Sequence, residues 1–206
     1  MISNKHRYTI LRATQFLLAP FFTIISVFLK KNNNIILTSS LNEEFSDNSK
    51  ALFEMLVRLD EFADRVYFVL NNATLAEKLN KKYSGRFISN TSLTNCIFIL
   101  RARYWFCASL EMPAPSFFQR FIRQVYHLGH GMPVKKFGLL ENQVSWYKKI
   151  YYWFVTSNIS KSVITTIFFT KYISAGYALN QSKLIKIPQP KTYQIAFPLK
   201  IENAIL

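Results

Sequence analysis

The stretch that decides the fold covers residues 34–70 and reads NIILTSSLNEEFSDNSKALFEMLVRLDEFADRVYFVL. Its first part, residues 34–39, is a short apolar run typical of a buried strand. A helix is predicted next, with Ser46 or Asp47 at its N-cap and an apolar face made of Leu52, Met55, Leu56 and Leu59. A second apolar run at residues 66–70 completes a strand–helix–strand unit, which indicates parallel strands.

Strands and helices keep alternating beyond this unit. We predict further helices at residues 74–82, 93–102, 117–123 and 159–169. We predict further strands at residues 86–89, 104–109, 125–128, 153–156, 173–177 and 184–187. The fold class is therefore α/β, with a Rossmann-like open parallel sheet. The chain lacks a Gly-Xaa-Gly-Xaa-Xaa-Gly fingerprint and a P-loop, which disfavours dinucleotide binding and nucleoside-triphosphate hydrolysis.

A glycine-rich, basic loop follows the strand predicted at residues 125–128. Open parallel sheets bind ligands beyond the carboxyl ends of their strands, where this loop would lie. Gly129 and Gly131 allow main-chain N–H groups to turn toward an anion, and the imidazole of His130 can take a proton from a hydroxyl near neutral pH. Lys135 and Lys136 bring positive charge to a phosphate group. In the alternative interpretation, His130 caps a turn and the lysines form a solvated corner.

This loop resembles the His-Gly-Thr-Pro-Leu-Lys-Lys-Ile-Gly signature of the CDP-glycerol glycerophosphotransferase family, which builds teichoic acids and related glycerol-phosphate polymers. The matching residues are His130, Gly131, Pro133, Lys135, Lys136 and Gly138. Residues 45–54 resemble the family's asparagine-serine-lysine segment, and residues 100–109 and 187–192 are similar to two further family segments. Met132 stands where the family has threonine, and Gly129 stands where it has tryptophan.

The resemblance implies the first domain of a glycosyltransferase-B-like architecture and a phosphoryl-group transfer. In that reaction, a hydroxyl of a lipid-linked or polymer acceptor attacks the β-phosphate of CDP-glycerol and releases CMP. The site residues that the resemblance implies are His130 as the general base and, for substrate or phosphate binding, Gly129, Gly131, Lys135, Lys136, Asn48, Ser49 and Lys50. Neither a metal nor another cofactor is expected.

Family members carry a second, nucleotide-binding domain after this region, and the 206 residues do not include it. We expect residues 1–31 to associate with the membrane and residues 32–206 to form the acceptor-side domain. Two functions stay open. One is an enzyme, completed by a second chain or active as part of a longer product, and the other is a non-catalytic, membrane-bound module that binds the acceptor.

Residues 10–29 are rich in Leu, Phe and Ile, and basic residues flank them on both sides. The uninterrupted apolar part is shorter than the roughly 20 residues that a spanning helix needs, and Pro20 lies inside it. We therefore expect a helix in the membrane interface, with lysines at the headgroups. A secretory signal and a buried first helix are the alternatives, and no small-residue cleavage pattern supports the signal. Residues 30–34 are interpreted as a polar linker.

The chain carries 26 basic and 11 acidic residues, a formal charge of +15, which indicates a polyanionic partner. An anionic bilayer, a phosphate-rich polymer, a nucleotide and a nucleic acid all fit this charge. Residues 146–153 read WYKKIYYW and are interpreted as a contact with lipid headgroups, a stack for nucleic-acid bases or a core strand. No nucleic-acid-binding module accompanies them, which disfavours the nucleic-acid interpretation. Together with the N-terminal segment, the charge leads us to expect a peripheral or monotopic protein at the cytoplasmic face of the cell membrane.

The two cysteines, Cys96 and Cys107, lie in apolar segments without the spacing of metal ligands. This pattern disfavours a zinc site and a disulfide framework. We expect both to be buried, reduced thiols.

Overall fold

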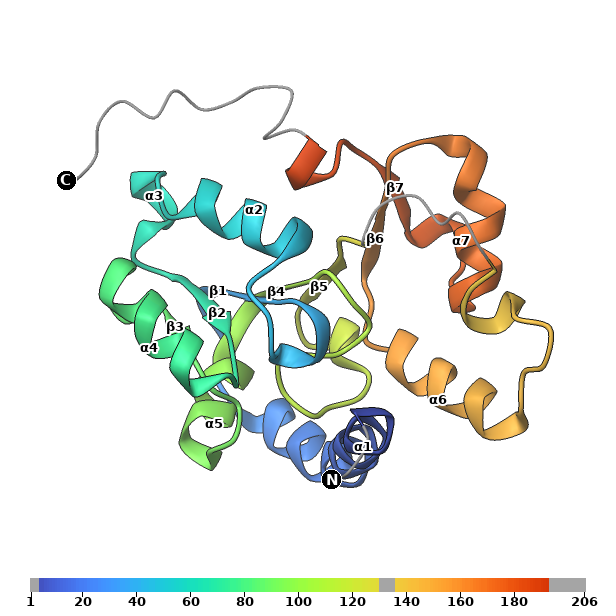
Figure 1. Ribbon diagram of the computed structural model, residues 1–206, viewed down its shortest axis with the longest axis horizontal. Coiled ribbons are helices and arrows are strands. Elements are labelled where there is room, and N and C mark those ends of the chain that lie inside the picture. The colour runs from blue at the N-terminus through green and yellow to red at the C-terminus, as the bar shows by residue number, and fades with distance from the viewer. Residues whose placement is uncertain (1–3, 130–135, 193–206) are drawn as a thin grey trace.

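The computed structural model describes the backbone of residues 4–129 and 136–192, and the side chains within those ranges from Arg12 onward. In this described part, the strands form one parallel sheet in the order β3-β2-β1-β4-β5-β6-β7 (Figure 1). They are β1 Asn32–Thr38, β2 Val66–Val69, β3 Phe87–Ile88, β4 Ala102–Cys107, β5 Gln124–His127, β6 Lys161–Ile164 and β7 Leu184–Lys186. The predicted Rossmann-like open parallel sheet is confirmed.

Helices cover both faces of the sheet (Figure 1). On one face lie α2 (Asp47–Leu56) and α4 (Ala73–Lys82), with the short α3 (Asp60–Ala63) between them in the chain. On the other face lie α1 (Asn4–Phe28) and α5 (Leu93–Arg101), and α6 (Trp146–Thr156) packs beside α1. Helix α7 (Thr170–Tyr177) lies in the connection from β6 to β7.

Successive residues of β1 pack into two separate cores. Ile35 and Leu37 point toward α2 and α4, where they belong to the same cluster as Phe53. Ile36 points the other way and packs in the cluster that contains Trp105 and residues of α1 and α5. Side chains alternate across a strand, so an unbroken apolar run is what a strand buried on both faces needs.

At the amino edge of the sheet, the buried guanidinium of Arg123 joins α1 to α5 and β4. It donates to the carbonyl oxygens of Leu100 at 2.7 Å and Ala102 at 2.6 Å, and to Ser26 Oγ of α1 at 2.6 Å. Lys31 Nζ donates to the carbonyl oxygens of Ser26 at 2.5 Å and Leu100 at 3.0 Å. Cations stabilise the free carbonyl groups at a helix C-terminus. These five residues, the amino-edge cluster, therefore fasten α1 to the end of α5.

The N-terminal helix continues through Pro20, and one of its faces is buried against the domain. Ala19, Phe22 and Ser26 lie on that face, whereas the opposite face is exposed. The linker predicted at residues 30–34 is wrong in its second half, because β1 already begins at Asn32. Pairing of β1 with β4 extends to this residue and overrides the polar composition.

The strand predicted at residues 153–156 is wrong, because these residues complete α6. The interpretation of residues 146–153 as a core strand is wrong for the same reason. Aromatic and β-branched residues favour strands in general. Here Tyr151, Phe154 and Val155 are partly buried at helical spacing, and this packing decides the conformation.

Three further predictions between α5 and β7 are wrong. The helix predicted at residues 159–169 contains β6 instead, which pairs with both β5 and β7. The strand predicted at residues 173–177 is part of α7, and the helix predicted at residues 117–123 shrinks to a 3-10 turn at Gln119–Phe121. Pairing with distant strands decides these segments, and a local apolar pattern does not contain that information.

Candidate functional site

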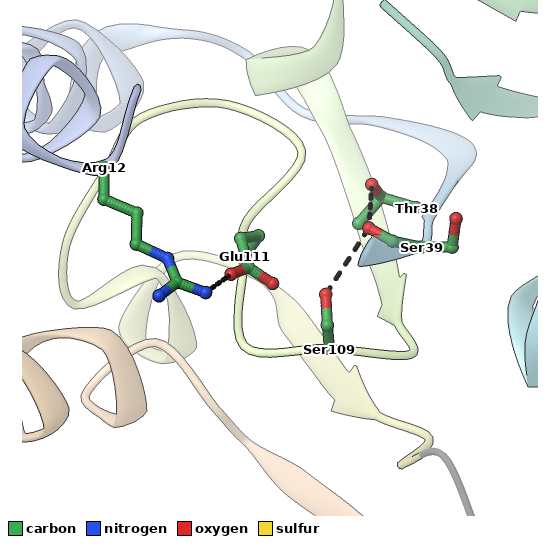
Figure 2. A network of polar contacts seen from close by, with 5 residues as sticks. All are labelled: Arg12, Thr38, Ser39, Ser109 and Glu111. Carbon is green, nitrogen blue, oxygen red and sulfur yellow. Dashed lines mark hydrogen bonds and ion pairs between the residues drawn. The ribbon is translucent and has the colours of Figure 1, made fainter. Parts of the chain in front are cut away.

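The candidate site lies at the carboxyl edge of the sheet, between β1 and β4. The strand order reverses at this point, because the chain builds β2 and β3 on one side of β1 and then continues from β4 on the other. Open α/β sheets bind ligands at such a switch point. Figure 2 shows the residues at the ends of the two strands, with Thr38 and Ser39 at the end of β1 and Ser109 and Glu111 after β4.

The segment from the end of β1 to the first residue of α2 has an unusual backbone. Leu41, Asn42 and Asp47 have positive φ angles of 55°, 59° and 59°, a region that residues other than glycine rarely adopt. The side chain of Asn42 fixes the turn, since its Nδ2 donates to the carbonyl oxygen of Met112 at 3.2 Å and its Oδ1 accepts from the hydroxyl of Thr38. Such conformations persist where surrounding contacts impose them, and they cluster at functional sites.

Asn48, in the first turn of α2, ties three distant segments together. Its Nδ2 donates to the carbonyl oxygen of Gly129 at 2.7 Å, and its Oδ1 accepts from the backbone N–H of Lys191 at 3.1 Å. Gln189 adds a third bond, from its Nε2 to the carbonyl oxygen of Leu128 at 3.1 Å. We call these five residues the carboxyl-edge clamp. Through it, the start of α2, the end of β5 and the segment after β7 meet at one place.

Gly129 suits its position in the clamp for two reasons. Its φ angle is +70°, and a Cβ atom there would lie 3.3 Å from Nε2 of Gln189. A side chain at this position would therefore strain the backbone and crowd the clamp. His130 is the next residue in the chain. His130, Gly131 and Lys135 lie outside the described residues.

The other predicted binding residues have different surroundings. Ser49 is buried, and its hydroxyl donates to the carbonyl oxygen of Thr38 at 2.6 Å, so it supports the end of β1. Lys50 is exposed on α2. Lys136 is also exposed, and its Nζ donates to Oδ1 of Asn142 at 3.0 Å. The structure thus brings Asn48 and Gly129 into direct contact, holds Ser49 against the sheet and places both lysines at the surface.

Glu111 is a buried carboxylate that the sequence analysis does not single out. It is 7% exposed and accepts a hydrogen bond from Nη2 of Arg12 at 2.7 Å (Figure 2). Ser109, two residues earlier, donates to the carbonyl oxygen of Ser39 at 3.4 Å and closes the gap between the two strand ends. The signal that points to Glu111 is a carboxylate between two apolar residues, two positions after the strand predicted at residues 104–109. The sequence around its partner on α1, Arg12, gives no such signal.

His127 is a second imidazole in the same stretch as His130, and the sequence analysis does not single it out. It is buried at the end of β5, with its Nδ1 2.9 Å from Oγ of Ser162 and its ring centre 5.0 Å from that of Tyr177. Burial raises the pKa of Tyr177 to about 12, which keeps the phenol neutral. These contacts link β5 to β6 and α7 immediately before the loop that carries His130.

The two cysteines are buried, as predicted. Burial raises the pKa of the Cys96 thiol to about 11. The thiol, not the thiolate, is therefore present at neutral pH, and Cys96 is a poor nucleophile.

Comparison with known proteins identifies a family that matches the sequence and solved structures with a similar fold. The sequence matches the family described as CDP-glycerol:poly(glycerophosphate) glycerophosphotransferase over residues 20–195. The fold is similar to that of the wall teichoic acid polymerase TagF, with a TM-score of 0.68 and 14% identity over 95% of this chain and 49% of that chain. A TagF variant soaked with CDPG gives a TM-score of 0.69 at 13% identity, with the same coverage. This chain thus spans about half the length of those structures. No curated protein matches the sequence significantly.

Proposed function

Because this chain belongs to the CDP-glycerol:poly(glycerophosphate) glycerophosphotransferase family, we propose that its carboxyl edge forms the acceptor side of a glycerophosphotransferase site. The donor is CDP-glycerol, and the acceptor is a lipid-linked or polymer chain in the synthesis of a teichoic-acid-type or other cell-surface polymer. The carboxyl-edge clamp carries this proposal, because it holds the residue before His130 against α2 and the segment after β7.

The proposed reaction needs a base and positive charge at one place. His130 takes the proton of the acceptor hydroxyl while that oxygen attacks the β-phosphate. The new P–O bond forms as the bond to CMP breaks, and CMP leaves. Lys135, Lys136 and the loop amides at Gly129 and Gly131 offset the charge on the phosphate. Asn48 and Ser49 act as positioning residues through the backbone groups that they hold, and Lys50 adds positive charge to the rim.

The nucleotide of the donor needs a binding site that we assign to a second domain. The similar TagF structures are about twice as long as this chain, which covers 49% of them. A partner chain, or a longer form of this protein, would supply that domain. The soak of a TagF variant with CDPG supports the donor class for this proposal. If no such domain joins the chain, the site binds an acceptor without transfer.

The test is the transfer of radiolabelled glycerol phosphate from CDP-glycerol in membranes of cells that make this protein with its natural partners. We expect His130→Ala to abolish transfer while the amount of membrane-bound protein stays the same. Lys82→Ala, on the exposed surface of α4, is the matched control and should retain full transfer. Undiminished transfer by His130→Ala would remove His130 from the mechanism. If the unchanged protein binds the acceptor without transfer, the protein is a non-catalytic module that binds the acceptor and not a transferase.

We also propose that the exposed face of α1 rests on an anionic membrane. Leu17, Phe21 and Ile24 are 79%, 54% and 62% exposed, and they recur at the spacing of one helical face. The sequence of α1 has no acidic residue, and Lys30 and Lys31 follow shortly after its end at Phe28. An apolar face with basic flanks is typical of an interfacial helix. Among the described residues, no helix has both the length and the apolar character that crossing a membrane requires.

A further inference from the structure

A cleft of about 790 Å³ opens between α1 and α6. The α1 wall contains Ala13, Phe16 and Leu17, and the α6 wall contains Trp146, Ile150 and Tyr151. The two helices lie on the same face of the sheet (Figure 1). Phe16 of α1 packs edge-on against Phe154 of α6 at 5.2 Å between ring centres, which joins the helices beside the cleft. The cleft is therefore a gap between two packed helices with aromatic and aliphatic walls.

The charged side chains that line the cleft neutralise one another. Arg12 Nη2 lies 2.7 Å from Oε1 of Glu111, and Lys148 Nζ lies 2.6 Å from Oε2 of Glu141. Two cations and two carboxylates leave no net charge in the lining, although the whole chain carries +15. An anion gains little in such a place, because each cation already has its carboxylate. An uncharged, apolar ligand is complementary to these walls.

The rims of the cleft continue into exposed apolar surface. Leu17 begins the outer face of α1 that we assign to the membrane, and Trp146 and Ile150 continue along α6 to Trp153. Both Trp146 and Trp153 are exposed, at 73% and 57%, and tryptophan favours the membrane interface. A hydrocarbon chain can therefore pass from the bilayer into the cleft without crossing water.

One residue of the cleft lining, Glu111, also belongs to the candidate site. It lies in the loop after β4, and only Leu110 separates it from Ser109. Ser109 is bonded to Ser39 at the switch point, and Figure 2 shows Glu111 between Arg12 and this pair. A chain that fills the cleft would thus bring its polar end toward the carboxyl edge of the sheet.

We propose that this cleft binds a single hydrocarbon chain of a membrane lipid. The inference rests on the proposed function in one respect, because it makes the cleft the place where the lipid part of a lipid-linked acceptor lies. Its other supports are the apolar walls, the paired charges and the continuity with the exposed faces of α1 and α6. Binding of the chain itself requires neither a nucleotide donor nor a phosphate.

The test uses 11-bromoundecanol, an uncharged single chain whose bromine quenches nearby tryptophan, added to the full-length protein without vesicles. Trp146 lines the cleft, whereas Trp105 is fully buried in the core. We expect saturable quenching that Trp146→Phe largely removes. Ala13→Phe adds bulk to the cleft wall at an exposed position and should weaken binding about tenfold. Circular dichroism checks that each variant is folded.

Ile24→Ser is the matched control for the cleft, since Ile24 belongs to the exposed face of α1 and does not line the cleft. It should keep the quenching and lose binding to anionic phosphatidylglycerol vesicles in a sedimentation assay. Quenching that rises linearly without saturation, or that is equal in Ala13→Phe and the unchanged protein, would overturn the proposal.

These outcomes separate the cleft from the proposed function. If the protein shows saturable quenching but never transfers glycerol phosphate, the result supports chain binding in the cleft and contradicts only the proposed transferase function. If transfer depends on His130 but the protein shows no saturable quenching, the result contradicts only chain binding in the cleft. Loss of vesicle binding by Ile24→Ser with intact quenching supports both the membrane face and the separate cleft.

Discussion

At the amino edge of the sheet, Arg123 and Lys31 place positive charge against carbonyl oxygens, whereas at the carboxyl edge Asn42 and Asn48 hold the loops through neutral amides. Burial lowers the pKa of Arg123 to about 9 and that of Lys31 to about 8, so charge at the amino edge carries a desolvation cost. Lys50 on α2 and Lys136 are exposed. The difference teaches that this fold anchors its amino edge with buried cations and holds its carboxyl-edge loops with neutral amides.

The largest effect is expected at the amino edge. Arg123→Met removes donors from the carbonyl oxygens of Leu100 and Ala102 and from Ser26 Oγ, and leaves buried acceptors without partners. It also removes a guanidinium that lies 4.2 Å over the ring centre of Trp105. We expect the free energy of unfolding to fall by about 3–5 kcal/mol, measured by urea denaturation.

The control for this variant is Arg103→Met, since Arg103 is an exposed arginine on β4. Its free energy of unfolding should change by less than about 0.5 kcal/mol. Equal losses in the two variants would mean that the anchoring role of the amino-edge cluster is wrong. A large loss of unfolding free energy in Arg123→Met alone would support the anchoring role of the amino-edge cluster.

A smaller loss of stability and a larger loss of function are expected at the carboxyl edge. Asn48→Asp keeps an acceptor for the N–H of Lys191 but places a carboxylate against the carbonyl oxygen of Gly129. The free energy of unfolding should fall by about 1–3 kcal/mol, because one buried hydrogen bond is replaced by repulsion. Transfer of labelled glycerol phosphate should fall about tenfold, because the loop before His130 is released.

Asn33→Asp tests whether the added charge alone causes that loss. Asn33 is an exposed residue at the amino end of β1, far from the carboxyl edge of the same strand. Stability and transfer should both remain at the level of the unchanged protein. If Asn48→Asp lowers stability but leaves transfer intact, the clamp supports the fold and has no part in the reaction.

The sequence predicts β1 and β2 well, because each contains an apolar run that is largely buried on both faces. It also locates β4 and β5, each of which has aromatic or β-branched residues at its centre. It further identifies residues 45–54, 100–109, 130–138 and 187–192 as segments that resemble one family. It does not predict how they meet. The contacts of Asn48 join residues 81 and 143 positions apart, and the Arg12–Glu111 pair spans 99 positions. Local periodicity has no information about such pairs, so the amino-edge cluster and the cleft emerge only from the fold.

The smallest predicted effect is a pH dependence at the amino edge. Desolvation and the nearby charge of Arg123 lower the pKa of Lys31 from 10.5 to about 8. Between these two pH values the folded protein releases the Lys31 proton and the unfolded chain keeps it. Because the unfolded state then binds more protons, this group makes the free energy of unfolding rise with pH in that window. Lys31 is partly exposed, so the gain should be only about 0.3–0.5 kcal/mol.

The measurement is urea denaturation at pH 7 and pH 8, at the lower end of this window. Above about pH 9 the cysteine thiols of the unfolded chain ionise, while the raised pKa of Cys96 keeps its thiol protonated in the folded state, and this lowers the free energy of unfolding. Lys31→Met should reduce the increase in the free energy of unfolding between these two pH values. Lys183 has a pKa lowered to about 8 by burial, so Lys183→Met should remove a further part from a different region of the chain. Lys82→Met, on the exposed surface of α4, should leave the rise unchanged. If the rise survives in Lys31→Met at full size, the Lys31 ammonium is not destabilised by burial, and the contrast between the edges rests on Arg123 alone.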